Sequence, residues 1–189
     1  MAHYTPNFHK KNPSHFAGSD HSSYTSPMLF NLRDVSHTDL DAVLELNESV
    51  VPAVNSITIE QMRWFADQAA YFRIAEDNDR LAAFLIGLRP GSDYNSPNYL
   101  WFCRHYDDFG YVDRVAVADH ARRSGLASKL YDDFRANLPD SISVMTCEVN
   151  LKPPNESSMR FHEGMGFHQV GSLAIDDGKN EVALMELKL

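Results

Sequence analysis

Apolar residues recur along this chain with two different periods, and the periods predict helices and strands in turn. Positions spaced near the helical repeat predict one helix that opens at Thr38-Asp39 and ends around Pro52. A second helix is predicted to start at Thr58, because Gln61 follows three positions later in a capping-box pattern. Two more helices are expected at Gly125–Leu138 and Asn155–Glu163.

Runs rich in β-branched and aromatic residues, bounded by polar turns, predict strands between these helices. The expected strands are Leu29–Val35, Tyr71–Ala75, Leu81–Leu88, Tyr111–Val117, Ile142–Val149, Phe167–Ala174 and Glu181–Leu187. Pro90–Phe109 is expected to be a long connection that is rich in aromatic residues. The order β α α β β β α β α β β predicts an α/β (α+β) domain with a mixed sheet.

The first part of the chain differs from the rest. Met1–Pro27 contains no Leu, Ile or Val and is rich in Ser, His, Asn and Pro, so it cannot offset its ordering entropy by burial. We therefore predict an N-terminal extension over residues 1–27, flexible or lying on the surface, and a single domain over residues 28–189. Four of the nine histidines lie in the extension, but nothing enforces convergent geometry, so no metal site is expected.

Composition narrows the class of protein. The net charge is −9, so the chain lacks the basic footprint of a nucleic-acid binder. The sequence contains no run of about 18 apolar residues that would predict a membrane span, and it shows no apolar leader that would predict secretion. The two cysteines, Cys103 and Cys147, make neither a disulfide framework nor a zinc spacing. These features predict a cytoplasmic protein with no nucleic-acid or membrane partner, and they leave a homodimer open.

The most informative stretch is a Val-rich strand that runs through a turn into a helix. The turn carries Arg122, Gly125 and Ala127 in the pattern R-x-x-G-x-A. The first N–H groups of a helix lack intrahelical partners, and the helix dipole adds positive potential there. Small residues allow a bulky anion to approach the backbone, so this turn is a candidate phosphate cradle. An ordinary strand-to-helix turn is the alternative.

Here the sequence resembles a known family. The turn is similar to the acetyl-CoA-binding signature [RQ]-x-x-G-x-[GA] of the GNAT acetyltransferases. Asn155–Phe167 resembles the family's N-x-x-A-x-x-[LF]-Y-x-x-x-G-F, and Cys147-Glu148-Val149 resembles its L-E-V strand. The resemblance covers about Tyr111–Phe167.

The resemblance implies the GNAT fold, with a mostly antiparallel central sheet of about seven strands, splayed at the cofactor site and flanked by helices. Acetyl-CoA, with no metal, would lie between the Tyr111–Val117 and Ile142–Val149 strands. The cofactor-binding residues implied are Val115, Ala116, Val117, Arg122, Arg123, Ser124, Gly125, Leu126, Ala127 and Asn155.

Two departures from the family pattern affect the chemistry. His162 stands where the family usually has the Tyr that protonates the departing thiolate. A histidine can also donate a proton, and we expect a neighbouring carboxylate to raise its pKa; a packing role is the alternative. Asn150–Pro154 is about two residues longer than the usual spacing and is expected to form a stiff loop, which puts the placement of Asn155 in question.

A base must remove a proton before an ammonium can attack a thioester. Glu148 resembles the base of the ribosomal-protein N-acetylating branch. Asp113 lies on the neighbouring strand, in the region where histone-acetylating members keep a glutamate, though not at the same position. Many members use no side-chain base, so water is a third option. Expected acceptor-lining residues are Asn47, Glu48, Trp64, Trp101 and Tyr106.

The predicted function is an N-acetyltransferase that moves acetyl from acetyl-CoA to a primary amine of a small molecule or peptide. A GNAT domain that takes a longer acyl group is a variant of this prediction. An acyl-CoA sensor without turnover is the alternative from another class, suggested by His162. A Rossmann nucleotide binder is excluded, because the chain lacks both the alternating β and α units and a G-x-G-x-x-G turn after the first strand.

Overall fold

The computed structural model of the protein describes residues 30–175 and 177–189, so the extension predicted over residues 1–27 lies outside the described residues. Within the described ranges the strands are β1 (Asn31–Asp34), β2 (Tyr71–Asp77), β3 (Arg80–Leu88), β4 (Gly110–Val117), β5 (Val144–Lys152), β6 (His168–Ile175) and β7 (Asn180–Lys188). The α-helices of the same ranges are α1 (Leu40–Ser49), α2 (Ile59–Gln68), α3 (Pro97–His105), α4 (Leu126–Ala136) and α5 (Glu156–Gly164).

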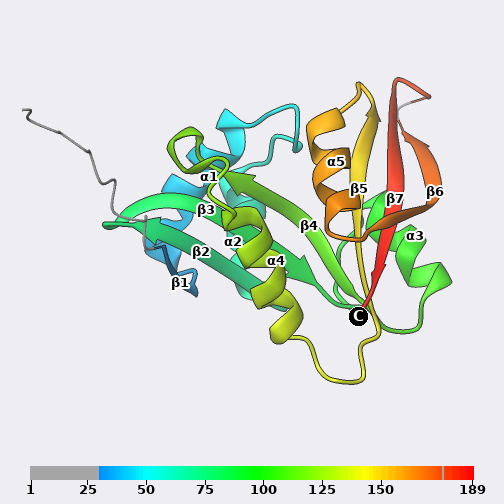
Figure 1. Cartoon of the computed structure of the whole chain (residues 1–189), viewed down its shortest axis with the longest axis horizontal. Helices are drawn as coiled ribbons and strands as arrows, with labels where there is room; N and C mark the ends of the chain where they lie inside the picture. Colours follow the sequence, from blue (N-terminus) through cyan, green and yellow to red (C-terminus); the bar gives the residue numbers. More distant parts are fainter. Residues whose placement is uncertain (1–29, 176) are drawn as a thin grey trace, which may run out of the picture.

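The strands form one seven-stranded sheet in the order β1-β2-β3-β4-β5-β7-β6. Every neighbouring pair is antiparallel except β4 and β5, which run parallel. Figure 1 shows α4 and α5 on the side of the sheet turned to the viewer, with α1 and α2 behind it. This architecture confirms the predicted mixed, mostly antiparallel sheet with flanking helices.

Each face of the sheet carries its own hydrophobic core, and β3 shows how the sequence serves both. Phe84 and Ile86 pack against α1, α2 and α3, whereas Leu85 between them packs against α4. All three side chains are fully buried. Because successive strand residues point to opposite faces, a strand covered on both sides reads as a continuous apolar run.

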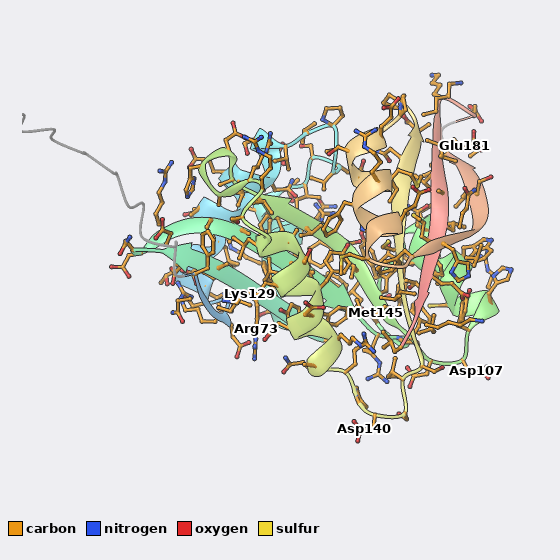
Figure 2. The ribbon with its side chains drawn as sticks, in the orientation of Figure 1. Arg73, Asp107, Lys129, Asp140, Met145 and Glu181 are labelled. Atoms are coloured by element: carbon orange, nitrogen blue, oxygen red, sulfur yellow. The ribbon has the colours of Figure 1, made fainter. Side chains whose placement is uncertain are left out.

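Polar contacts from β2, the second strand of the sheet, hold α4 in place. Arg73 on β2 forms an ion pair with Asp133 of α4 at 2.8 Å, and Figure 2 labels Arg73 beside that helix. The Tyr71 hydroxyl donates to the same carboxylate at 2.8 Å. These bonds fix the position of the C-terminal part of α4. The first turn of the helix, at its other end, belongs to the site described below.

The start of α2 follows its predicted signal, whereas the start of α3 carries a signal that the sequence analysis missed. Thr58 and Gln61 form the predicted capping box at the start of α2. The segment Pro90–Phe109 is not a plain connection, because it contains α3. An extended Ser96 followed by Pro97 at the first helical position is an ordinary helix-start signal. The aromatic residues of this segment therefore include those of a helix packed on the sheet.

The loop expected over Asn150–Pro154 is also wrong in part. β5 continues to Lys152, which pairs with Glu181 on β7 after an irregularity in register. Only three residues separate β5 from α5, and Asn155 caps that helix by accepting a hydrogen bond from the Ser158 N–H at 3.1 Å. Pairing with β7 therefore continues the strand through residues whose local composition indicates a loop.

Candidate active site

The sheet divides where its two parallel strands meet. β4 and β5 pair over only three positions, and the last pair is Val112 with Cys147. Figure 1 shows the two strands converging at one end and diverging toward the other. The next residue on each strand is a carboxylate, Asp113 on β4 and Glu148 on β5. The structure therefore brings the two predicted base candidates together at the start of the opening.

A β-bulge gives Asp113 its orientation. Ile86 of β3 pairs with Arg114, and Gly87 pairs with Val112, so Asp113 is the extra residue between two regular pairs. An extra residue lets two successive side chains point to one face. Asp113 and Arg114 both face the α1 and α2 side, where the Arg114 guanidinium lies 5.1 Å from the centre of the Phe65 ring.

Asp113 is held in a buried ion pair. Its Oδ2 accepts a hydrogen bond from Arg114 Nε at 2.8 Å, and the two side chains are 3% and 6% exposed. Arg114 Nη1 also donates to Asn47 Oδ1 at 3.0 Å and to the carbonyl of Asn55 at 3.3 Å. This network joins the bulge to α1 and to the loop between α1 and α2.

Glu148 lies in a different electrostatic setting. Its Oε2 accepts a hydrogen bond from the Tyr111 hydroxyl at 2.7 Å, and no ion pair with Glu148 occurs among the described residues. Burial and the nearby charge of Asp113 raise the pKa of Glu148 to about 8, against smaller opposing effects of Tyr111, Asn98 and Arg114. A carboxylate in this setting binds a proton far more tightly than an exposed one.

Three of the predicted acceptor-lining residues lie near the pair. Asn47 contacts Arg114 directly, and Glu48 accepts a hydrogen bond from Asn47 at 2.9 Å. Trp64 stacks on Tyr94 with ring centres 5.6 Å apart. Sequence reasoning missed Tyr94, whose hydroxyl faces Asp113; burial and then that carboxylate raise its pKa well above the ordinary value.

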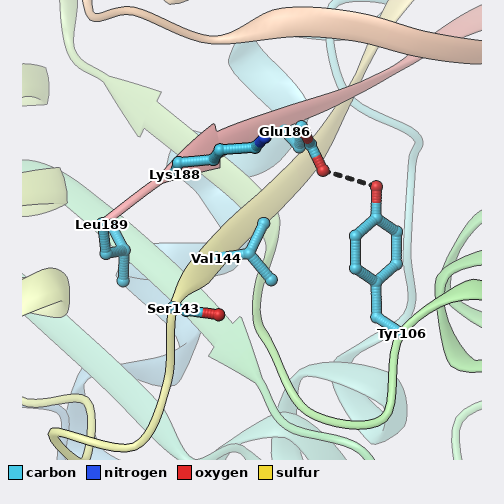
Figure 3. Close-up of a pocket in the computed structure, with 6 residues that line it drawn as sticks. All are labelled: Tyr106, Ser143, Val144, Glu186, Lys188 and Leu189. Carbon is cyan, nitrogen blue, oxygen red and sulfur yellow. Dashed lines mark hydrogen bonds between the residues drawn. The ribbon is translucent and has the colours of Figure 1, made fainter.

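The other two predicted lining residues lie elsewhere. Trp101 stacks on His105 of its own helix, and it covers Gly171 of β6. The Tyr106 hydroxyl donates to Glu186 on β7 at 2.6 Å, and Figure 3 shows both residues lining a separate pocket of about 340 Å³. The pocket is formed by the first residues of β5 and the last residues of β7, away from the opening.

His162 is buried between α4 and α5, and its surroundings differ from the expectation. Its Nδ1 lies 2.8 Å from the Ser158 carbonyl, which can only accept, so Nδ1 carries the ring proton. Nε2 then accepts the hydrogen bond from the Tyr131 hydroxyl at 2.7 Å. Burial lowers the pKa of His162, so the expected carboxylate-raised pKa is wrong. The predicted role as proton donor stays a prediction.

The first turn of α4 has the geometry of an anion cradle. Gly125 caps the helix in the left-handed conformation, with φ of 80°, and a Cβ built there would meet open space. The first intrahelical bond runs from the Lys129 N–H to the Gly125 carbonyl at 3.0 Å, so the preceding N–H groups of the turn have no partner within the helix. Arg122 and Arg123 are exposed beside the turn.

The three β4 residues that are predicted to bind the cofactor lie beyond the last β4–β5 pair. Val115, Ala116 and Val117 pair with β3 on one side, while pairing with β5 has already ended at Val112. In such a strand every second residue turns its N–H and C=O away from the paired neighbour. Backbone donors and acceptors therefore line the β4 side of the opening.

Comparison with known proteins identifies a family for this chain and solved structures with a similar fold. The family model described as "Acetyltransferase (GNAT) family" matches residues 40–167. The solved structures that are similar to this chain include the following three. Ard1 from Thermoplasma volcanium is 17% identical with a TM-score of 0.65, covering 85% of this chain and 97% of its own. The ribosomal-protein-S18-alanine N-acetyltransferase from Escherichia coli is 16% identical with a TM-score of 0.60, covering 85% and 94%. NAA60 from Arabidopsis thaliana, solved with a bisubstrate analogue, is 15% identical with a TM-score of 0.68, covering 85% and 98%.

A search of curated sequences and a search of the described residues for membrane-spanning helices both gave negative results. No match is found among curated protein sequences. Across the described ranges, no helix has both the length and the apolar character needed to cross a bilayer.

Proposed function

The chain belongs to the GNAT acetyltransferase family, and from this premise we propose that it transfers an acetyl group from acetyl-CoA to a primary amine of a small molecule or peptide. The amine attacks the thioester directly, in a complex that holds both substrates. One observation carries the proposal: the first turn of α4 has N–H groups without helical partners, and a pair of carboxylates, Asp113 and Glu148, lies where β4 and β5 part.

The α4 start fits the pyrophosphate of coenzyme A. Open space at Gly125 admits a bulky anion to the backbone, and the free N–H groups of the turn supply donors. Arg122 and Arg123 add positive charge, although Arg122 also pairs with Asp119 at 2.9 Å on the surface. The pantetheine arm would then pass the backbone of Val115–Val117.

Gly125→Glu is expected to weaken acetyl-CoA binding about tenfold or more, because a carboxylate would occupy the proposed phosphate position. Calorimetry on the folded variant measures this. Gly178→Glu is the matched control: Gly178 has nearly the same φ, 81° against 80°, and also faces open space, but lies in the β6–β7 turn. Both variants carry similar backbone strain, so an equal loss of affinity in both would refute the cradle.

Glu148 is the proposed base. An amine reaches the site as an ammonium, and Glu148 in its ionised form accepts one proton before the nitrogen attacks the carbonyl carbon. The C–S bond then breaks and coenzyme A leaves as a thiolate, while the nitrogen releases its second proton, through water, to that thiolate; the products are the amide, the free thiol and protonated Glu148. A pKa of about 8 makes the carboxylate a stronger base than an ordinary glutamate, which suits proton transfer from an amine near neutral pH. Asp113 is already paired with Arg114, which makes it the weaker candidate.

For His162 we propose a packing and positioning role. With its one ring proton on Ser158 and its other nitrogen occupied by Tyr131, the neutral ring holds the Tyr131 hydroxyl in place. In this arrangement the ring has no free proton for a thiolate, which would take its proton from water.

His162→Phe tests the two roles against each other. We expect a loss of about 1–2 kcal/mol of stability, because the Tyr131 hydroxyl loses its acceptor, and a kcat within about tenfold of the parent. The double variant with Tyr131→Phe should recover much of the stability. An acid role instead predicts a fall in kcat of about 10²-fold and the loss of a high-pH limb from the rate profile. Chemical denaturation and pH–rate curves separate the outcomes.

A screen of amine acceptors with release of free thiol as the readout tests the function as a whole. Peptide N-termini belong in the screen because similar structures include a ribosomal-protein-S18-alanine N-acetyltransferase and the NatC complex bound to Gag peptide and CoA. Small-molecule amines complete it. Acetyl-CoA binding without turnover of any amine would favour the sensor, while turnover would exclude it.

A further inference from the structure

We propose that Arg114 is the positioning residue that divides the roles of the two carboxylates: it holds Asp113 in a buried ion pair, so that Glu148 is the carboxylate left to exchange a proton. This inference rests on the proposed function of Glu148 as the proton acceptor. It concerns why two carboxylates on facing strands behave differently, which neither the turn motif nor the family match addresses.

The two carboxylates start from equivalent places. Each follows the last β4–β5 pair on its strand, and each faces the side of the sheet that α1, α2 and α3 cover. Two like charges this close cannot both be ionised cheaply in a buried site. What breaks the equivalence is the bulge, which places the guanidinium of Arg114 beside Asp113, with Nε 2.8 Å from Oδ2.

Arg114 is itself held in place from two other elements. Asn47 of α1 and the Asn55 carbonyl both accept from Nη1, and the Phe65 ring of α2 lies under the guanidinium. A cation with this many fixed partners cannot turn toward Glu148 without breaking them. Arg114 therefore forms its ion pair with Asp113 and not with Glu148.

The remaining described groups around the pair do not supply a second cation. Tyr94 faces Asp113 and Arg114 from the segment after β3, and Tyr111 donates to Glu148 from β4. From α1, Glu48 contributes negative charge near Arg114. With Asp113 neutralised by Arg114, the negative charges of Glu48 and of ionised Glu148 have no cation of their own among the described residues, which favours a cationic amine.

The experiment counts the carboxyl groups that titrate, with no substrate present. Carbon-13 NMR of side-chain carboxyls, followed through the neutral pH range, should show one buried carboxyl that titrates near pH 8 in the parent. Glu148→Gln should remove that signal and leave no other buried carboxyl titrating there. Arg114→Met should add a second, because the buried ion pair that holds Asp113 is then lost, whereas Arg114→Lys should restore the parent count.

Arg89 pairs with Asp108 at 2.7 Å on the surface, so Arg89→Met should leave the count of buried titrating carboxyls unchanged. A second titrating carboxyl in Glu148→Gln, or an unchanged count in Arg114→Met, would overturn the inference. If Arg114→Met does not fold, a second titrating carboxyl in Glu148→Gln would still overturn the inference. Absence of turnover would contradict the proposed function but would not alter these spectra.

Discussion

Glu148→Gln is expected to lower turnover by about 10²-fold or more while leaving acetyl-CoA affinity nearly unchanged. The amide cannot accept the amine proton, but it keeps the size of the side chain and can still accept from Tyr111. In the parent, kcat/KM should rise with pH to a plateau with a midpoint near 8, as Glu148 ionises. In the variant that limb should disappear.

The same substitution should raise stability at alkaline pH. Glu148 has a pKa of about 8 in the folded state against an ordinary value of 4.5, so the folded state binds the extra proton between these values. Its contribution is fully present below about pH 4.5 and is lost as pH rises through about 8. Glutamine has no such loss, so we expect the variant to be more stable than the parent by about 2 kcal/mol at pH 9, a value reduced from the full shift to allow for water in the opening.

Glu186→Gln provides the control. Glu186 is also a buried carboxylate on the same sheet, and it also accepts a hydrogen bond from a tyrosine hydroxyl, at 2.6 Å from Tyr106. It lies outside the β4–β5 opening, so its amide should retain turnover within about threefold. Chemical denaturation at several pH values and steady-state kinetics supply both readouts. Parent-like turnover in Glu148→Gln would remove Glu148 as the base.

Asp113→Asn is expected to destabilise the fold by about 3 kcal/mol, because it leaves the buried guanidinium of Arg114 without its counter-charge. Asparagine keeps the shape and one hydrogen bond, so the change isolates the charge. Replacing both partners, Asp113→Leu with Arg114→Met, should recover part of the loss, since apolar side chains need no counter-charge. Denaturant unfolding at neutral pH measures all three proteins.

Asp108→Asn is the matched control for Asp113→Asn. Asp108 also pairs with an arginine, Arg89, at 2.7 Å, but its side chain is 42% exposed. An exposed pair contributes about 1 kcal/mol or less. Equal small losses for Asp108→Asn and Asp113→Asn would mean that water reaches the Arg114 pair, and the electrostatic account of the site would then fail.

Periodicity predicts most of the strand and helix order because most elements carry local signals. The capping box at Thr58 and the Gly125 turn are examples that depend on a few adjacent residues. α3 escapes the prediction because its buried residues, such as Tyr99 and Phe102, resemble the aromatics of a loop, although Ser96-Pro97 is a helix-start signal. Tertiary pairing with β7, which no local signal reports, carries β5 past its expected end.

The candidate site is predictable as a set of residue types but not as an arrangement. Asp113 and Glu148 are candidates on motif grounds, but their different settings depend on contacts with Arg114 and Tyr111 that form only in the fold. The predicted direction of the His162 pKa shift is wrong, because the sequence pattern does not show that the ring lies in a core and bonds to Tyr131.

One signal for the bulge is present in the sequence. Val112, Val115 and Val117 all face the α4 side, yet they are spaced by three and then by two. In a regular strand the spacing on one face is two throughout, so the odd interval marks an extra residue between Val112 and Val115. The valine spacing is therefore a local indication that Asp113 and Arg114 share one face of the sheet.

Because Asp113 is the extra residue of the bulge, deleting its codon would remove the carboxylate without changing how β3 and β4 pair. Losing the single codon for Asp113 would leave Arg114 opposite Ile86 and Val112 opposite Gly87, as they are now, in an unbroken ladder. Each flanking side chain would keep its face, so both hydrophobic cores would keep their residues, and the compensation needed would be at Arg114, which would lose its counter-charge. A one-codon insertion or deletion in β4 can thus add or erase one of the two acids, a short evolutionary route between members of one fold that differ in how they handle a proton.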